Sequence, residues 1–384
     1  MKKFIKKYPL IFFELCLISF YVLTLVLFSL LKMNVDFAEW YSRTIGRFFQ
    51  TVNGFLVKYL PFSVTELSVI LLFVICVVLL VLSIRRAKKK QGYQSLSMLL
   101  MIVTLVLSAV AKYNACCTMQ YNRAPLPLGQ YDEEVDPNNY ETIIQYFLDD
   151  FNYCASLQTF KSNNDVKSPY SLWDLNKIFE KEYLRLTDDY FAPFTSYGKP
   201  MGSSFIYREL WITGLYYSTF GESNINILST NAEIPFTIAH ELAHSKGVMR
   251  ENDANMVAMY LTLTSSNEYI RYCGYINSFP YILNVAKYSQ DTTMYSRLRD
   301  NIDEKIMNNW RYISAYWNSH KLGKTIGNFF NDLYLKLQGT QNGTDSYDDT
   351  PVDVDPGTGT IVNFSNYQKI FLGIYDTNNQ SLEP

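Results

Sequence analysis

Residues 238–244 read Ile238-Ala239-His240-Glu241-Leu242-Ala243-His244, and this HExxH stretch contains two of the three histidines in the chain. On an α-helix, His240 and His244 lie one turn apart on one face, with the Glu241 carboxylate beside them. Zinc-dependent hydrolases use this arrangement, because two imidazoles bind the metal and a carboxylate works next to it. The stretch therefore predicts a helix that carries one catalytic Zn²⁺. The plainer alternative is a surface helix with two unrelated histidines.

A catalytic zinc site needs a third protein ligand and an open position for water. Gly247 predicts that the motif helix ends in a left-handed turn, and residues 251–258 predict a second helix. One face of that second helix carries Glu251, Ala254, Asn255 and Ala258. Because the alanines allow a close approach to the first helix, we expect Glu251 to be the third ligand and Asn255 to orient an imidazole. The alternative is that Glu251 and Asp253 are only acids favoured by the helix dipole.

Glu241 points about 100° around the helix from His240, so it is poorly placed to be a third ligand. We expect it to act as the general base, which takes a proton from the attacking water and later passes it to the leaving amine. A further donor should stabilise the oxyanion of the tetrahedral intermediate. The candidates are His320, Tyr269, Tyr272 and Tyr275. Each of them is better explained as a structural residue.

Charge and apolar residues are distributed unevenly along the 384 residues. Residues 1–112 contain 14 Lys and Arg against 4 acids, a net charge of +10, whereas the remainder contains 20 against 32, a net charge of −12. Three apolar runs in the first part are each close to the length that crosses a bilayer. They cover residues 10–31, 67–84 and 96–111. This pattern predicts a membrane anchor over residues 1–112, followed by a domain outside the bilayer.

Basic clusters at residues 2–7 and 85–90 flank the predicted spans. By the positive-inside rule both clusters are cytoplasmic, so the N-terminus is inside and everything after the third span is extracytoplasmic. Between the first two spans, aromatic residues alternate with polar groups, as in segments that lie at a membrane surface. These aromatic residues are Trp40, Tyr41, Phe48, Phe49, Phe55, Tyr59 and Phe62. The lipid bilayer of the cell membrane is therefore one expected partner.

The residues after the anchor are enough for one domain with a substantial core. Apolar periodicity predicts helices over residues 140–157, 171–186, 267–288 (bent or broken at Pro280), 293–317 and 327–337. A small β element is predicted between residues 205 and 228. Within it, Asn224, Ile225 and Asn226 could form an edge strand that receives an extended peptide substrate, or an ordinary half-buried strand.

The C-terminal residues 341–384 are predicted to be an extension with an acidic loop rich in Gly and Thr, for which calcium binding is a weaker alternative. Six cysteines allow one disulfide outside the membrane without requiring it. No phosphate-binding glycine loop or basic stripe occurs after residue 112, and the negative charge there argues against nucleic acid.

Several stretches resemble a bacterial membrane family known as domain of unknown function 3810. They are residues 39–43, 61–63, 121–123, 125–126, 199–200, 214–217, 221–226, 235–244, 251–255 and 331–336. The resemblance implies a zincin-like metallopeptidase. HExxH followed by E-x-x-A-N is similar to the ligand pattern of other zincins, including the CAAX-processing and repressor-cleaving types, and this supports Glu251, although Asn255 replaces their acid. A metzincin pattern fails at Arg250, where a third histidine should stand.

Together these features predict an α-helical membrane anchor with three transmembrane helices and a mainly α, α+β zincin-like domain with a small β-sheet at residues 113–340. We expect a zinc metallopeptidase that hydrolyses a peptide or protein substrate near the membrane surface. An intramembrane protease is excluded, because Lys246, Arg250 and Glu251 cannot be buried in lipid. The alternative is a non-catalytic sensor or scaffold with a structural zinc, in which Glu241 would have no purpose.

Overall fold

The computed structural model describes residues 2–132, 135–136, 139–287, 293–320, 323–338, 353–354, 357 and 361–375. The predicted acidic loop at residues 341–360 lies almost entirely outside the described residues. The chain divides into two compact units. The first comprises Met1–Ala124 and Tyr217–Glu222, and the second comprises Pro125–Tyr216 and Ser223–Pro384.

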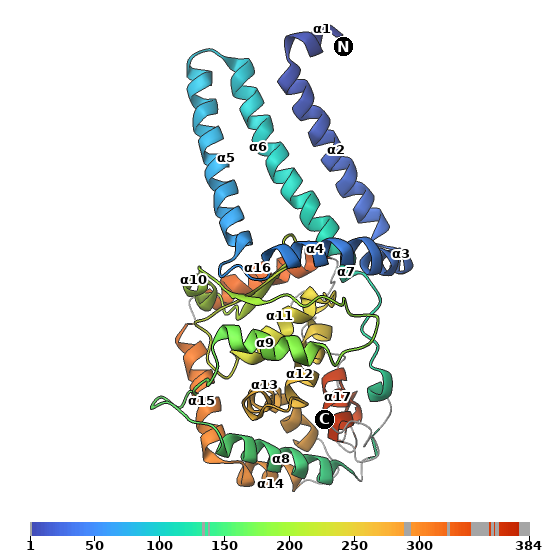
Figure 1. Ribbon diagram of the computed structural model, residues 1–384, viewed down its shortest axis with the longest axis vertical. Coiled ribbons are helices and arrows are strands. Elements are labelled where there is room, and N and C mark those ends of the chain that lie inside the picture. Colours follow the sequence, from blue (N-terminus) through green and yellow to red (C-terminus); the bar gives the residue numbers. More distant parts are fainter. Residues whose placement is uncertain are drawn as a thin grey trace. The chain divides into compact units, whose positions relative to one another are not determined.

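The first unit contains three helices that are long and apolar enough to cross a membrane, as predicted. They are α2 (Pro9–Leu31), α5 (Val64–Lys88) and α6 (Gly92–Tyr113), and α6 packs against both of the others (Figure 1). A short helix, α1 (Lys2–Lys7), precedes them. The helices α5 and α6 extend beyond the predicted apolar runs, because backbone hydrogen bonding continues through polar and basic residues at their ends.

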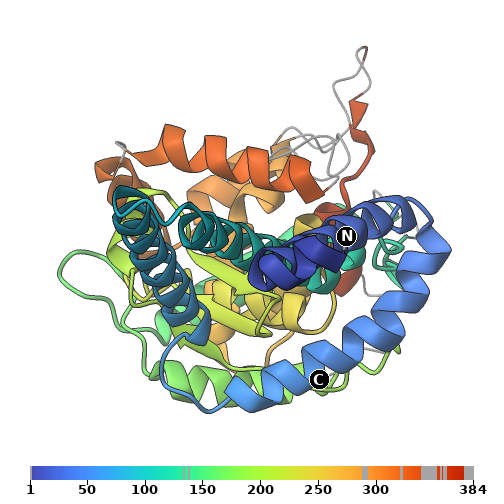
Figure 2. The ribbon, with the colours of Figure 1, turned by 90° about the horizontal axis from the view of Figure 1, so that it is seen from above.

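The segment between α2 and α5 is also helical. It consists of α3 (Val35–Tyr41), a π-helical turn η1 (Ser42–Gly46) and α4 (Arg47–Val57). Figures 1 and 2 show these three as one continuous curved run that lies crosswise to the long helices. Next to this run, α6 continues through η2 (Asn114–Thr118) into α7 (Met119–Tyr121), which packs against α3.

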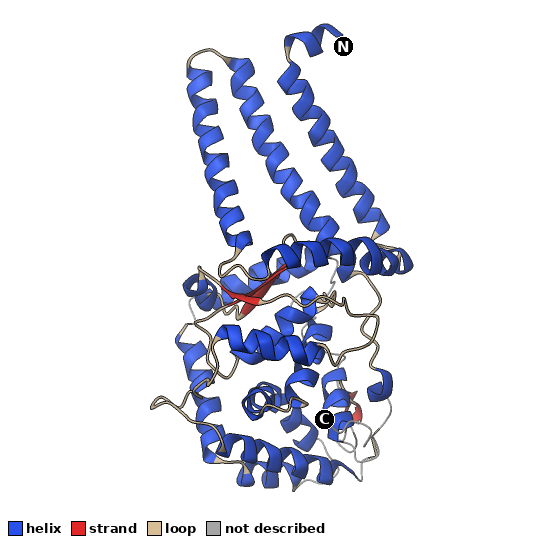
Figure 3. Cartoon of the chain, viewed as in Figure 1, coloured by secondary structure: helices blue, strands red, loops and turns tan. Residues whose placement is uncertain are grey.

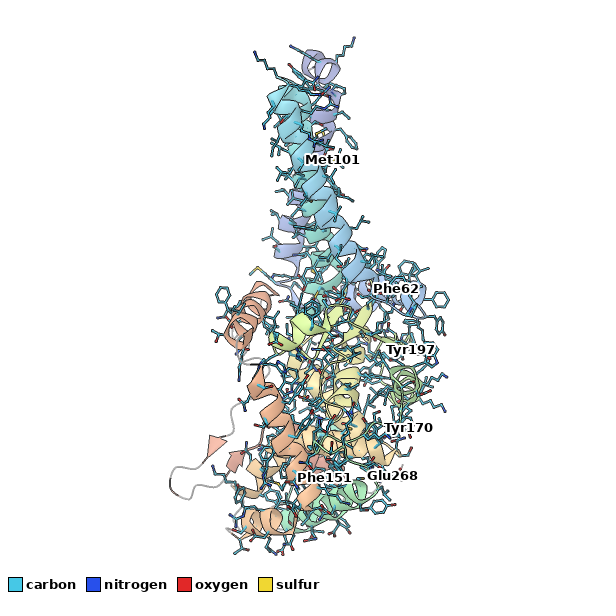
Figure 4. The ribbon with its side chains drawn as sticks, turned by 90° about the vertical axis from the view of Figure 1, so that its left-hand side faces the viewer. Phe62, Met101, Phe151, Tyr170, Tyr197 and Glu268 are labelled. Atoms are coloured by element: carbon cyan, nitrogen blue, oxygen red, sulfur yellow. The ribbon has the colours of Figure 1, made fainter. Side chains whose placement is uncertain are left out.

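The second unit is mostly helical, as predicted (Figures 1 and 3). Its helices are η3 (Gly129–Asp132), α8 (Tyr140–Ser156), α9 (Leu172–Tyr183), α10 (Ser204–Glu209), α11 (Ile234–Ser245), α12 (Glu251–Leu263), α13 (Glu268–Lys287), α14 (Met294–Asn301), α15 (Glu304–Ser319), α16 (Lys324–Gln338) and α17 (Asn366–Tyr375). Aromatic rings such as Phe147, Phe151 (labelled in Figure 4) and Phe371 fill its core. Because Phe371 lies on α17, part of the chain beyond residue 340 belongs to this core.

Two details of the predicted helices are clarified by the structure. The helix α13 runs through Pro280 without a break, so of the predicted bend or break the break does not occur. The helix predicted over residues 293–317 is instead divided into α14 and α15. The division occurs because Ile302 is extended and the Asp303 side chain accepts a hydrogen bond from the Lys305 backbone N–H, which starts a new helix.

A small three-stranded sheet, red in Figure 3, has the strand order β1-β3-β2. Its strands are β1 (Gly198–Pro200), β2 (Gly214–Tyr217) and β3 (Glu222–Ile225), and β1 and β3 are parallel, with Lys199 opposite Asn224. The prediction that Asn224, Ile225 and Asn226 form an edge strand is therefore wrong, because β3 is paired on both sides and these residues are fully buried. Two short strands, β4 (Asp353–Val354) and β5 (Ile361–Asn363), pair elsewhere.

Candidate metal centre

The HExxH residues lie on α11, and Glu251 is the first residue of α12. Pro235 in the first turn of α11 fixes a helical φ, and Gly247 ends this part of the chain in a left-handed turn with φ 92°. These two helices pack side by side (yellow in Figure 1). Their alanines at positions 239, 243, 254 and 258 are fully buried. Small side chains allow the two backbones to approach closely, as the sequence predicted.

The packing brings three ligand atoms together. The Nε2 atom of His240 lies 3.1 Å from Nε2 of His244 and 3.1 Å from Oε2 of Glu251, and His244 Nε2 lies 3.5 Å from the same oxygen. Ligands held about 2.0 Å from a tetrahedral zinc are separated by about 3.3 Å, so these three atoms match one face of such a tetrahedron. Within the described part of the chain, they form the one group of three or more His, Cys, Asp or Glu ligand atoms that lies within 4.8 Å.

The hydrogen bonds on the far side of each imidazole fix its tautomer. His244 Nδ1 lies 2.7 Å from the Val248 carbonyl oxygen, which the Gly247 turn brings back toward the ring. His240 Nδ1 lies 2.8 Å from Oδ1 of Asn255. Because both oxygens can only accept, both Nδ1 atoms carry hydrogen, and the Nε2 atom of each ring is the one left to bind a proton or a metal ion beside Glu251.

Asn255 is itself held in place. Its Nδ2 donates a hydrogen bond to the Tyr367 hydroxyl at 3.1 Å, and Tyr367 is buried on α17. The Tyr367 ring packs 4.7 Å from the ring of Tyr281. Asn255 therefore has the position predicted for it, with its oxygen toward His240 and its amide nitrogen toward the C-terminal helix.

Burial disfavours charged groups at this centre, but the attraction between the Glu251 carboxylate and the histidines is stronger than this effect of burial. Although desolvation acts against both groups, the two histidines hold the pKa of Glu251 well below its usual range, and Glu251 in turn raises the pKa of His244 to about 9. In the metal-free protein a proton on His244 thus takes the place of a cation beside the carboxylate. A metal ion binding here would displace this proton.

Glu241 is buried next to the three ligand residues. Desolvation raises its pKa to about 7, and its Oε2 atom has no hydrogen-bond partner. The start of strand β2 passes close to it, because a Cβ placed on Gly214 would lie 2.5 Å from Glu241 Oε1. Only glycine fits at position 214 without displacing the Glu241 side chain.

Further residues at the centre were not identified from the sequence. Tyr183 donates a hydrogen bond from its hydroxyl to the Ala239 carbonyl on α11, and Ser223 donates to the Glu241 carbonyl at 2.8 Å. The Tyr216 ring on β2 lies 5.9 Å from the ring of His244. These residues come from parts of the chain that no local spacing connects to the motif, so the sequence alone gave no signal for them.

The four predicted oxyanion donors have other partners. On α13, the hydroxyl of Tyr269 donates to the Asn231 carbonyl, that of Tyr272 to Asn309 Oδ1, and that of Tyr275 to Asp150. His320 bonds through Nδ1 to Glu209 at 2.9 Å and packs on the Tyr316 ring. The structure therefore gives these four residues structural roles and does not bring them to the cluster.

The cysteines form no disulfide. All six lie in the described part of the chain and none is in a disulfide, and Cys154 and Cys273 are buried thiols of the second unit. Burial raises the pKa of Cys154 to about 12, so it remains a neutral thiol.

Comparison with known proteins gives one result. No curated protein and no solved structure matches the chain. Residues 41–352, which include parts of both units and the residues of the candidate metal centre apart from Tyr367, match the family described as "Protein of unknown function (DUF3810)". The chain belongs to this family.

Proposed function

We propose that the chain is a membrane-anchored zinc metallopeptidase in which His240, His244 and Glu251 hold one zinc ion and Glu241 is the general base. The observation that carries the proposal is the convergence of two imidazole Nε2 atoms and one carboxylate oxygen at 3.1–3.5 Å, with both Nδ1 atoms committed elsewhere. Two imidazoles with one carboxylate are a donor set that suits catalytic zinc and leaves a position open.

The chemistry follows from the charges around the cluster. Zinc bound there would acidify a water molecule and polarise the substrate carbonyl. Glu241 would then take up the proton of the attacking water and deliver it to the leaving amine. In the metal-free protein burial raises its pKa to about 7, and a nearby zinc ion would lower this value and favour the ionised carboxylate that accepts the proton. Its buried Oε2 atom has no hydrogen-bond partner, so it can accept a proton without first breaking an existing hydrogen bond.

The site also argues against a purely structural zinc. Structural zinc sites usually have four protein ligands, whereas three converge here. A buried carboxylate oxygen without a partner reduces stability and so calls for a functional explanation.

The membrane part of the proposal rests on sequence and helix composition. Three helices can cross a bilayer, and their basic ends would be cytoplasmic by the positive-inside rule. The second unit then begins at Pro125, four residues after α7 ends at Tyr121, on the extracytoplasmic side. A substrate held by the site would accordingly be a peptide or protein segment near the outer surface of the cell membrane.

The test is the metal content of the full-length protein in detergent, measured by mass spectrometry. The variants are His240→Ala, Glu251→Ala and Glu241→Gln, and His320→Ala is the matched control because it removes the one histidine outside the cluster. We expect one zinc per chain in the wild type, Glu241→Gln and His320→Ala proteins, and loss of zinc in the other two. If zinc binding is unaffected by His240→Ala, the ligand assignment is wrong.

Hydrolysis of a mixed peptide library separates the peptidase from the scaffold. A peptidase cleaves peptides as wild type and His320→Ala, and loses this activity as Glu241→Gln while keeping its zinc. If the zinc-loaded wild type cleaves no peptide that the Glu241→Gln protein leaves intact, the protein is a zinc-binding scaffold instead.

A further inference from the structure

One side of the segment from Trp40 to Phe62 exposes apolar groups and no charge. Its exposed residues, which we call the aromatic face, are Trp40, Thr44, Ile45, Phe48, Phe49, Val52, Phe55, Leu56, Tyr59, Leu60, Pro61 and Phe62. Phe62 is labelled in Figure 4. Single exposed apolar side chains are ordinary, but a continuous set along a helix marks an interaction surface.

Helix α8 of the second unit shows what a water-facing helix of this chain looks like. It is also amphipathic, yet its exposed residues include Glu141, Gln145 and Asp149. On α4 the exposed Phe55 is 64% and Leu56 is 69% accessible, with no charged residue exposed beside them. The difference in composition indicates that the aromatic face does not lie in water.

The opposite side of α4 is occupied by protein. Gln50 and Gly54 are buried there, and a Cβ on Gly221 would lie 2.9 Å from the Gly54 backbone nitrogen. Asn53 donates a hydrogen bond to the Thr219 carbonyl at 3.2 Å. These contacts, all within the first unit, fix which side of α4 points outward.

Both ends of the segment are attached to the long apolar helices. At its start, the Tyr41 ring packs 5.7 Å from Phe28 in the last part of α2, and the Tyr41 hydroxyl donates to the Ala115 carbonyl after α6. At its end, Glu222 accepts hydrogen bonds from the backbone N–H groups of Val64 and Thr65, the first residues of α5. These are the helix ends opposite to the basic clusters, so both attachments lie at one surface of a bilayer crossed by the three helices.

We propose that the aromatic face is a lipid-binding surface, which lies in the boundary between headgroups and acyl chains of the outer leaflet. A helix whose two ends are fixed at the bilayer surface and whose outer side is uncharged and rich in Trp, Tyr and Phe is suited to this position. A protein partner would explain the exposed apolar groups but not their continuity with membrane helices at both ends. The inference does not depend on the metal centre.

The test uses native tryptophans of the full-length protein in phosphatidylcholine vesicles. The lipid carries bromine, which quenches tryptophan emission, either close to the headgroup or near the end of the acyl chain. Comparison of wild type with Trp40→Phe gives the emission of Trp40, and comparison with Trp173→Phe gives that of an exposed tryptophan of the second unit. We expect the Trp40 emission to be largely lost with bromine close to the headgroup and less affected by deep bromine, and the Trp173 emission to be unchanged.

A second pair of variants tests α4 directly. In the Trp40→Phe background, Phe55→Trp places a reporter on the aromatic face, and Tyr146→Trp places one on the exposed side of α8, where Tyr146 is 53% accessible. Quenching of the first reporter alone by shallow bromine supports the proposal. If neither reporter emits less in brominated lipid than in plain lipid, the proposal is overturned. It is also overturned if deep bromine quenches the Phe55→Trp reporter more strongly than shallow bromine, because the segment is then buried in the bilayer core.

Discussion

The hydrogen bond between His240 and Asn255 can be tested by a short series of substitutions. Asn255→Ala removes the acceptor 2.8 Å from His240 Nδ1, and it also removes the donor to the Tyr367 hydroxyl. The imidazole then loses the contact that fixes both its orientation and its tautomer, so its Nε2 lone pair is no longer held toward Glu251. We expect weaker zinc binding with an unchanged fold, because alanine is a good helix former at this position of α12.

The size of the effect follows from the surroundings of this bond. Loss of an outer-sphere partner of a zinc ligand reduces affinity by about 10- to 100-fold, or about 1.4–2.8 kcal/mol. The upper part of that range is expected here, because Tyr367 is only 1% accessible and water cannot easily replace the lost acceptor. Asn255→Asp should bind zinc at least as well as wild type, since a carboxylate accepts the same hydrogen bond and makes the imidazole more basic. Tyr367→Phe removes only the outer bond, so we expect a loss within about tenfold.

The assay is a competition titration of the full-length protein against a fluorescent zinc chelator. Asn252→Ala is the matched control, because it is the same substitution three residues earlier on α12, where the side chain bonds only to its own helix. We expect Asn255→Asp, wild type and Asn252→Ala to bind zinc most tightly. Tyr367→Phe should bind more weakly than these three, and Asn255→Ala should bind most weakly. If Asn255→Ala binds as tightly as Asn252→Ala, then Asn255 does not orient the ligand and the tautomer argument is refuted.

Three further outcomes are expected. Gly214→Ala should abolish peptide hydrolysis but retain zinc, because the new Cβ would displace the Glu241 carboxylate and not a ligand; equal activity of this variant would contradict the geometry. Burial favours protonation of Glu39, but Arg123 and Arg43 outweigh it and lower its pKa from 4.5 to about 2, so its stabilising effect is complete above pH 4.5 and is lost as the pH falls toward 2. Glu39→Gln should therefore lower the melting temperature most at neutral pH and progressively less in acid, which thermal unfolding at a series of pH values would measure. Finally, removal of zinc by a chelator should lower the melting temperature of the wild type. If the free zinc concentration before removal is 100 times Kd, the loss in free energy of unfolding is about 2.7 kcal/mol, and a variant without the zinc ligands should show no change.

The sequence predicted the parts of the site that depend on short-range geometry. Two histidines four residues apart on a helix must share a face, and Gly247 is needed for the turn that follows. The close approach of α12 to α11 could also be predicted, because the small alanine side chains on both helices allow the two backbones to pack closely. Two roles were considered for Glu251, a metal ligand and an acid favoured by the helix dipole. Its position fits both, because it is the first residue of α12 and lies next to both histidines.

Contacts between distant parts of the chain could not be predicted in this way. Tyr367 bonds to a residue 112 positions earlier, and neither residue has a pattern that points to the other. The order of the strands in the sheet also depends on contacts between distant parts of the chain. The alternation at Asn224 and Ile225 indicates a strand, but whether it lies in the middle or at the edge depends on β1, a strand of three residues containing Gly and Pro that no propensity predicts.

The buried carboxylates of the chain give the strongest reason to regard Glu241 as functional. Glu222 is fully buried and accepts hydrogen bonds from two backbone N–H groups and the Thr65 hydroxyl, and Glu182 pairs with Ser265 and Arg185. Both oxygens of each of these carboxylates therefore have a partner. Glu241 is buried to a similar extent, yet one of its oxygens has no partner and its pKa is raised to about 7. On packing grounds a neutral glutamine or an apolar side chain at position 241 would cost the fold less, and this favours the proposed role of Glu241 as a base beside the two histidines.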